Sequence, residues 1–186
     1  MIERLAVTVF PVLFLIVLFG GGALLRRRDI DQDGEPPLNK ILFLASKYLI
    51  VVVWAAMVLQ SWGIGFSLMQ TPRPLKWVAL GLWASGFVLL LIGRFGLGES
   101  FRIGSPTEST VLKADGLFRV SRNPMYVGVF TTLLAAVLYT LNPILLFIAL
   151  FVAAVHHRII LAEEDHLRTV FGEAYTAYCR RVRRYL

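Results

Sequence analysis

Long runs of apolar residues alternate along the chain with shorter polar segments, and the first three runs each have the length of a membrane-spanning helix. Residues 5–25, 48–72 and 77–93 contain no charged side chain. A helix that crosses the hydrocarbon core of a bilayer needs about 17–25 predominantly apolar residues. Each of these three runs therefore predicts one transmembrane helix.

A fourth uncharged run, residues 123–155, is too long for a single crossing. The dipeptide Asn142-Pro143 interrupts it, and a proline disfavours the helical conformation of the residue that precedes it. We therefore predict a tight helical hairpin with arms at residues 125–141 and 143–157. Taken together, the four runs predict five transmembrane helices.

The composition supports an all-α integral membrane protein and excludes an ordinary soluble globule. Hydrophobic residues make up 57% of the 186 residues and charged residues 17%, whereas soluble domains carry about 25% charge. The single Cys179 excludes an intramolecular disulfide. We divide the chain into a three-span scaffold, residues 1–93, and a second region, residues 94–186. This second region holds most of the unusual polar residues and is expected to end in cytoplasmic amphipathic helices.

The placement of basic residues predicts how the chain is oriented. With five crossings, one side of the membrane carries only Arg4, Arg73 and Lys76, three of the 19 lysines and arginines, and the other side carries the remaining sixteen. Short cytoplasmic loops carry an excess of Lys and Arg, so we expect the N-terminus outside and the C-terminus in the cytoplasm of a bacterial inner membrane. This asymmetry explains the net charge of +7 without a nucleic-acid partner.

Two features that resemble metal sites lack the spacing that a metal requires. Residues 29–34 begin like a calcium-binding loop, but Lys40 stands at the twelfth position, where a bidentate carboxylate is needed. His156 and His157 are adjacent, so on a helix they point about 100° apart, and His166 lies well beyond them. We therefore expect no metal.

The candidate chemistry begins where a long, glycine-containing connection runs into the fourth predicted helix, in the segment from Arg122 to Gly128. Pro124 suits the first turn of a helix, so Arg122 and Asn123 precede a helix N-terminus, which favours anions. Gly128 has no side chain and would let a ligand approach the backbone. Taken singly, Arg122 and Tyr126 also fit the role of interfacial anchors.

A second polar cluster follows the last predicted span. Glu163, Glu164 and Asp165 are consecutive acids at a membrane exit, which is costly unless the charges are paired or solvated. Glu164 and Arg168 stand at i, i+4 and predict an ion pair along one helix, whereas Glu163 has no such partner. Apolar residues at helical spacing among arginines predict a basic amphipathic helix over residues 175–186 that lies on anionic lipid.

Both clusters belong to one ordered set of residues between about positions 96 and 183. Its members are Gly98, Arg102, Leu112, Asp115, Gly116, Arg119, Arg122, Asn123, Pro124, Met125, Tyr126, Gly128, Glu163, Glu164, Leu167, Phe171, Gly172, Tyr175, Tyr178 and Val182. In order and spacing this set resembles the isoprenylcysteine carboxyl methyltransferase family, whose broader relatives are the membrane phospholipid methyltransferases.

The resemblance implies a multi-span enzyme that binds S-adenosylmethionine on its cytoplasmic side and releases S-adenosylhomocysteine. The methyl acceptor is expected to be a lipid-like or prenylated molecule that enters from the bilayer. Arg158 and Glu163 are the candidate catalytic residues, Arg158 being the weaker candidate, for orienting the substrate. The cofactor-binding residues that the resemblance implies are Arg122, Asn123, Tyr126, Gly128, Glu163 and Glu164, together with Gly116 and Leu117.

One departure from the family pattern bears on the acceptor. The motif histidine of the family is Asn123 here, and an amide does not titrate near neutral pH. A carboxylate acceptor needs no base, so we expect an acceptor that arrives deprotonated. Two alternatives stay open at this point. One is a membrane reductase with a nicotinamide cofactor on a related multi-span fold, and the other is a small membrane subunit that is not an enzyme.

Overall fold

The regular elements in the described part of the chain are helical, as predicted. The structure, a computed structural model, describes residues 1–26, 39–65, 67–97 and 112–186. The acidic loop at 29–34 and two members of the motif set, Gly98 and Arg102, lie outside the described residues. The elements in chain order are α1 (Ile2–Arg26), α2 (Lys40–Ser61), α3 (Arg73–Leu97), the short 3-10 helix η2 (Gly116–Arg119), α4 (Pro124–Thr140) and α5 (Pro143–Arg181).

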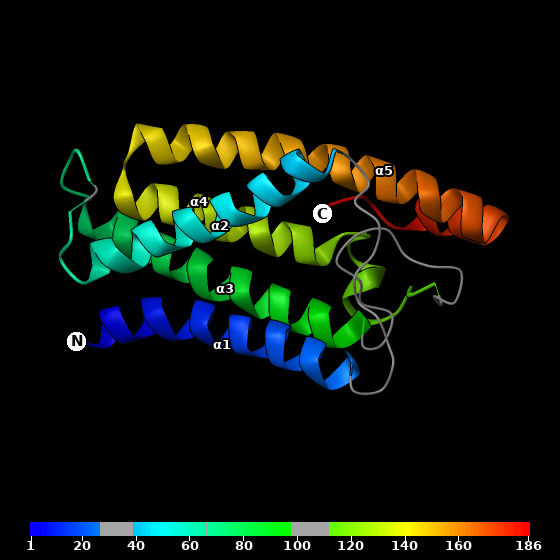
Figure 1. Ribbon diagram of the computed structural model, residues 1–186, viewed down its shortest axis with the longest axis horizontal. Helices are drawn as coiled ribbons and strands as arrows, with labels where there is room; N and C mark the ends of the chain where they lie inside the picture. Colours follow the sequence, from blue (N-terminus) through cyan, green and yellow to red (C-terminus); the bar gives the residue numbers. More distant parts are fainter. Residues whose placement is uncertain (27–38, 66, 98–111) are drawn as a thin grey trace.

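The lengths and compositions of these helices make the chain an integral membrane protein. Within the described ranges, α1, α2, α3 and α5 are long and apolar enough to cross a bilayer, and α4 is a shorter apolar helix. Successive helices run in alternate directions (Figure 1). The N-terminus and the α4–α5 turn therefore lie at one end, while the starts of α2 and α4 lie toward the other, beside the second half of α5.

The predicted start of the second span, in the run 48–72, is wrong by two helical turns. α2 begins at Lys40, because the side chain of Asn39 accepts a hydrogen bond of 2.9 Å from the Ile41 N–H and caps the helix. The helix therefore contains Lys47, a charged residue that the sequence pattern had placed in the preceding loop.

The predicted end of the same span is wrong as well. α2 ends at Ser61, and Gly63 has a φ of 95°. Glycine adopts this left-handed conformation without steric cost, and the conformation ends the helix. The uncharged residues between Gly63 and Pro72 thus belong to the connection that leads to α3.

The predicted hairpin of the last two helices is confirmed. α4 ends at Thr140 and Leu141 adopts a left-handed conformation with φ 45°. Asn142 then caps α5 by accepting a hydrogen bond of 2.9 Å from the Ile144 N–H, and Pro143 occupies the first helical position, where its missing N–H is not needed. Two residues therefore suffice to reverse the chain.

A cluster of aromatic side chains joins the N-terminal helices to α4. The ring of Phe87 lies 4.8 Å from that of Trp54 and 4.9 Å from that of Trp83, and Phe14 of α1 packs on Trp54 at 5.9 Å. The indole N–H of Trp54 donates a hydrogen bond of 3.0 Å to the Thr132 hydroxyl of α4. This cluster therefore packs α1, α2 and α3 together and ties α2 to α4.

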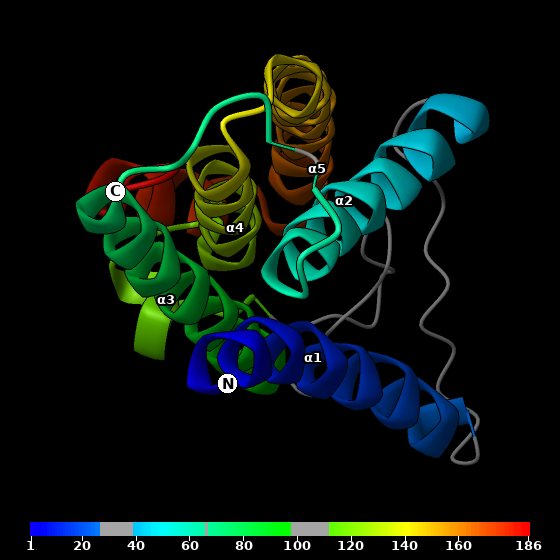
Figure 2. The same ribbon diagram turned by 90° about the vertical axis from the view of Figure 1, so that its left-hand side faces the viewer.

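Helices α3 and α4 approach each other closely because both carry glycine at the crossing. A Cβ atom on Gly128 would lie 2.8 Å from the Gly86 carbonyl oxygen and 3.0 Å from Leu90 Cγ. Small residues permit such contacts between membrane helices. In Figure 2, α4 lies between α3 and α5, whereas α1 and α2 diverge away from the viewer.

Helix α5 continues well beyond the apolar segment at its start and changes direction at Gly172, whose φ is 51°. The prediction that the apolar stripe within residues 175–186 faces lipid is wrong. Tyr175, Tyr178 and Val182 are only 1%, 3% and 9% exposed, because this apolar stripe packs inward and forms a hydrophobic cluster with other protein side chains. The end of the chain is therefore part of the folded body.

Candidate functional site

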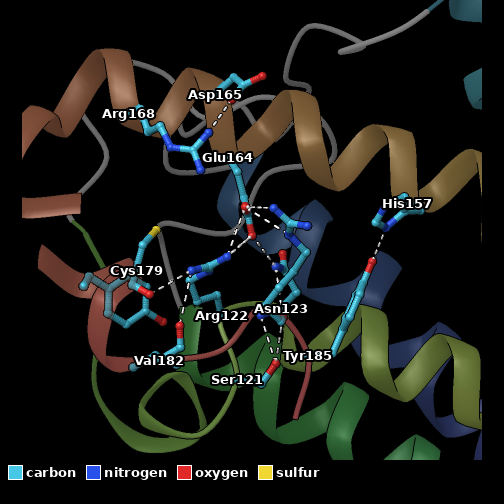
Figure 3. Close-up of polar contacts among 12 residues, drawn as sticks. Ser121, Arg122, Asn123, His157, Glu164, Asp165, Arg168, Cys179, Val182 and Tyr185 are labelled. Carbon is cyan, nitrogen blue, oxygen red and sulfur yellow. Dashed lines mark hydrogen bonds and ion pairs between the residues drawn. The ribbon is translucent and has the colours of Figure 1, made fainter. Parts of the chain in front are cut away.

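The carboxylate of Glu164 is the centre of a polar network at the end of the bundle where α4 begins (Figure 3). Arg122 donates to it from Nε and Nη2, both at 3.2 Å, and Asn123 donates from Nδ2 at 3.2 Å. Arg184 donates from Nε at 3.1 Å and from Nη2 at 2.9 Å. The Glu164 side chain is only 2% exposed, so these charge-assisted bonds replace the water that a buried carboxylate loses. The hydrogen bond to Glu164 raises the pKa of the Arg184 guanidinium.

Arg122 also binds the segment that follows α5, here called the C-terminal strap (residues 182–186). Its Nη1 donates to the carbonyl oxygens of Cys179 and Val182, both at 3.2 Å. Its backbone N–H donates to the Arg183 carbonyl at 2.9 Å, and Ser121 forms a parallel β-bridge with Arg183. One arginine thus connects the motif before α4, the acids of α5 and the strap.

The predicted ion pair between Glu164 and Arg168 is wrong. Arg168 pairs with Asp165 at 2.5 Å, where both side chains are largely exposed. Glu164 points inward from the same helix and meets Arg122 and Arg184 instead. Helical spacing permitted the local pair, but two guanidinium groups from distant segments satisfy the buried carboxylate better than one exposed neighbour.

Glu163 has a different environment from its neighbour. Its Oε1 accepts a hydrogen bond of 2.9 Å from the Tyr126 hydroxyl of α4. The ring of Tyr126 in turn packs edge-on against the His156 ring, with centroids 5.9 Å apart. The Nδ1 of His156 lies 2.9 Å from the Val152 carbonyl oxygen, so Nδ1 carries the hydrogen. Glu163 and Tyr126 therefore form a hydrogen-bonded pair. The His156 ring that packs against Tyr126 is itself fixed by a hydrogen bond to the α5 backbone.

The Glu164 network and the Glu163–Tyr126 pair both border a cavity of about 520 Å³. Its polar end contains Arg122, Asn123, Tyr126, His156, Glu163 and Glu164. The other walls are mostly apolar and come largely from α1 and α2, with the side chains of Phe14, Leu15, Leu18, Phe19, Phe43, Leu44, Tyr48, Ile50, Val51 and Trp54. The cavity thus joins a site for polar and charged groups to a site for an apolar chain.

The structure brings some of the expected site residues to this cavity and leaves others away from it. Arg122, Asn123, Tyr126, Glu163 and Glu164 line it. Among the described residues, four candidates lie outside the lining: Gly116, Leu117, Gly128 and Arg158.

Two of these placements have a clear physical reason. Gly128 faces Gly86, so its missing side chain serves the contact between α3 and α4 and not the approach of a ligand. Arg158 is exposed on α5, on the far side of the helix from the cavity-lining His156 and Ile159. Gly116 has a φ of 55° and begins η2, which turns the chain toward Phe118, and Phe118 does line the cavity.

Sequence reasoning missed three charged residues that belong to the site. Lys47 and Lys113 line the cavity, and Arg184 binds Glu164. Lys47 directly precedes the charge-free run 48–72, so the pattern placed it at the edge of a loop. Arg184 was one of several arginines near the end, and no local spacing distinguishes it from Arg180, because its partner Glu164 lies twenty residues earlier, beyond the reach of helical neighbours.

The histidines of α5 bind within the protein. His157 Nδ1 lies 2.6 Å from the Tyr185 hydroxyl of the strap, and His156 is hydrogen-bonded to the backbone of its own helix. No group of three or more His, Cys, Asp or Glu side chains in the described ranges is placed to hold a metal ion. The site is thus built from carboxylates, guanidinium groups, tyrosine and an amide.

Comparison with known proteins adds one finding. A family model described as phospholipid methyltransferase matches residues 75–174, which is more than half of the 186 residues. The match includes most of α3, the Arg122–Tyr126 motif and both Glu163 and Glu164, and it leaves out α1, α2 and the strap. No curated protein matches the chain.

Proposed function

The chain belongs to the phospholipid methyltransferase family, and from this membership we propose that it is a membrane methyltransferase that uses S-adenosylmethionine to methylate an acceptor with an apolar tail. The observation that carries this proposal is the cavity of about 520 Å³ that joins Glu163 and Tyr126 at one end to the apolar faces of α1 and α2 at the other. A donor with cationic groups and an acceptor with a lipid-like chain need such a combination.

Glu163 and Tyr126 are the residues that we assign to the cationic part of the cofactor. A sulfonium and an ammonium are attracted by a carboxylate and by the face of an aromatic ring. Glu163 offers a carboxylate that accepts a hydrogen bond of 2.9 Å from the Tyr126 hydroxyl, and both residues line the cavity. The Glu163 carboxylate would thus lie next to the methyl donor in the cavity.

Glu164, Arg122 and Asn123 have a different part in the proposal. Their hydrogen bonds to one another already satisfy the Glu164 carboxylate, so we assign them to the wall of the cofactor pocket, where they position the start of α4. Tyr126 stands on the first turn of that helix. The network therefore controls the site by fixing Tyr126 opposite Glu163.

When bound, the cofactor supplies an activated methyl group. The protein contributes by holding the donor and the acceptor in line, which can lower the barrier by several kcal/mol. The Asn123 amide, which donates to Glu164 and to the Arg184 carbonyl oxygen, has no titratable proton. We therefore retain a carboxylate or another acceptor that arrives deprotonated as the expected class.

The deciding experiment is calorimetric binding of S-adenosylhomocysteine to the detergent-purified protein. We expect micromolar binding by the wild type, and Glu163→Gln should weaken it by at least about tenfold, because a hydrogen-bonded or ion-paired charge contributes about 1.5–3 kcal/mol. Glu173→Gln is the matched control, because Glu173 lies on the same helix, is exposed and does not line the cavity.

The same preparation distinguishes the alternatives. Equal binding by Glu163→Gln and Glu173→Gln would remove Glu163 from the site. Absence of S-adenosylhomocysteine binding in folded protein, repeated in lipid nanodiscs, would refute the use of this cofactor. A titration with NADPH in parallel then tests the reductase alternative. If the folded protein binds neither S-adenosylhomocysteine nor NADPH, the remaining alternative is a membrane subunit that is not an enzyme.

A further inference from the structure

Lys47 is a charged residue inside an apolar helix, and the proposed methyl transfer does not yet use it. It lies seven residues after Lys40, so it is about 10 Å along α2 from the start of the helix. Ionisable side chains within membrane helices are costly, and they commonly face a protein cavity where they have a function. Lys47 is half-buried and lines the cavity that also contains Glu163 and Tyr126.

The ammonium group of Lys47 is held at a defined place. Its Nζ lies 3.6 Å from the centroid of the Phe43 ring, a distance at which a cation is attracted to the ring face. Phe43 is buried and forms a hydrophobic cluster with Val155, Ile159 and Tyr126. The ring therefore places the ammonium of α2 beside the part of α5 and α4 that forms the polar end of the cavity.

The charges that line the cavity leave an excess of positive charge. Among the described residues that line it, Lys47, Lys113 and Arg122 are basic and Glu163 and Glu164 are acidic. Arg122 binds Glu164, and in the proposed function Glu163 meets the cationic methyl donor, so we assign the lysines to the acceptor. A cation in a largely apolar cavity favours a ligand that carries negative charge, because desolvation strengthens the attraction.

We propose that Lys47 binds the oxyanion of the methyl acceptor, a carboxylate or a phosphate attached to an apolar chain that lies between α1 and α2. The identification of this ligand as the acceptor rests on the proposed function, but binding of the oxyanion can be measured without the cofactor. The family match begins at residue 75, so Lys47 lies outside the matched region.

The test compares wild-type protein with Lys47→Met and Lys47→Arg by equilibrium binding of radiolabelled probes in detergent. The probes are N-acetyl-S-farnesylcysteine, which has a carboxylate, its uncharged methyl ester, and dioleoylphosphatidylethanolamine, which has a phosphate. Lys40→Met is the matched control, because Lys40 is exposed at the start of the same helix and does not line the cavity.

We expect Lys47→Met to weaken binding of the acid about tenfold or more, as loss of a desolvated charge partner does. The ester should bind the wild type and Lys47→Met equally, Lys47→Arg should retain most of the affinity for the acid, and Lys40→Met should behave as wild type. The same loss with phosphatidylethanolamine and not with the acid would identify phosphate as the oxyanion, and the reverse would identify carboxylate.

Three results would overturn the proposal. Equal binding of both anionic probes by wild type and Lys47→Met would show that the lysine only extends toward the aqueous interface. Equal weakening of acid and ester would show a packing role.

The third result concerns Glu163, on which the Lys47 charge acts. If Lys47→Met loses S-adenosylhomocysteine binding as Glu163→Gln does, the lysine serves the carboxylate and not the acceptor. Wild-type protein that binds the acid through Lys47 but does not bind S-adenosylhomocysteine would instead refute the proposed function and leave the oxyanion site standing.

Discussion

Arg122 and Glu164 stand 42 residues apart in the sequence and meet through two hydrogen bonds of 3.2 Å. Their side chains are 10% and 2% exposed, so the pair is nearly withdrawn from water. Arg122 directly precedes the cap residue of α4, whereas Glu164 lies deep in α5. The two helices of the hairpin are therefore joined at the end that lies opposite their turn.

Removing one member of this pair should destabilise the protein strongly. Arg122→Met leaves the buried Glu164 carboxylate with fewer donors, and breaking a buried ion pair from one side costs about 3–5 kcal/mol. A thermal-shift measurement in detergent should show a clear fall in the midpoint of unfolding. Arg168→Met, which breaks the exposed pair with Asp165, should change the midpoint little, and equal effects of the two substitutions would contradict the burial argument.

Gly128→Ala should destabilise the helix pair and not act on the cofactor directly. A Cβ there would lie 2.8 Å from the Gly86 carbonyl oxygen, and forcing extra atoms into a close contact costs about 1–3 kcal/mol. The matched control is Gly81→Ala on α3, where nothing lies within 4 Å and alanine should leave the stability equal or slightly raised. Normal thermal stability of Gly128→Ala together with lost S-adenosylhomocysteine binding would return Gly128 to the ligand site.

Tyr126→Phe should separate the hydroxyl of this residue from its ring. The substitution removes the 2.9 Å hydrogen bond to Glu163 Oε1 but keeps the aromatic surface against His156. We expect S-adenosylhomocysteine affinity to fall about threefold to tenfold, in line with one hydrogen bond of about 1 kcal/mol, while Tyr126→Ala should lower it further. An unchanged affinity for Tyr126→Phe would mean that the hydroxyl does not orient Glu163 for the ligand. Tyr48→Phe is the control, since Tyr48 lines the apolar part of the cavity.

Arg184→Gln should loosen the strap. Glu164 would lose the hydrogen bonds of 3.1 and 2.9 Å from Arg184 but would keep those from Arg122 and Asn123. Because the Arg184 side chain is about a third exposed, the expected loss is smaller than for Arg122→Met, about 1 kcal/mol. Faster hydrogen exchange of the Arg122 amide, which donates to the Arg183 carbonyl, would report the loosening. Exchange as slow as in the wild type would show that the backbone bridge holds the strap unaided.

Much of the fold follows from local chemistry. The Asn142-Pro143 dipeptide predicted the hairpin correctly because a cap and a proline act within a few residues. The change of direction in α5 is local too, because Gly172 has a φ of 51°, a conformation that glycine adopts readily. Hydropathy located α1, α3 and α4, but it misplaced α2, since a single lysine in a span looks the same in sequence as a lysine in a loop. Whether Lys47 faces a cavity is decided by the packing of α4 and α5, which no window of α2 contains.

The candidate site was predicted only in part for the same reason. The order of motif residues marked Arg122 and Glu164 as members of one site, but spacing assigned Glu164 to Arg168 because helix neighbours are the only partners that a local pattern can offer. Likewise, the apolar stripe of Tyr175 and Tyr178 is compatible with a lipid surface or with a protein interior. The choice depends on Arg122, which draws the end of α5 inward by binding the carbonyl groups of Cys179 and Val182.

The strap also makes the polar end of the cavity a junction of three segments that are separate in the sequence. Arg122 precedes α4, Glu164 lies within α5 and Arg184 follows α5, so the carboxylate meets both guanidinium groups only in the folded bundle. A chain with misplaced helices would leave Glu164 without these two partners, and burial of this carboxylate therefore depends on correct packing of the hairpin.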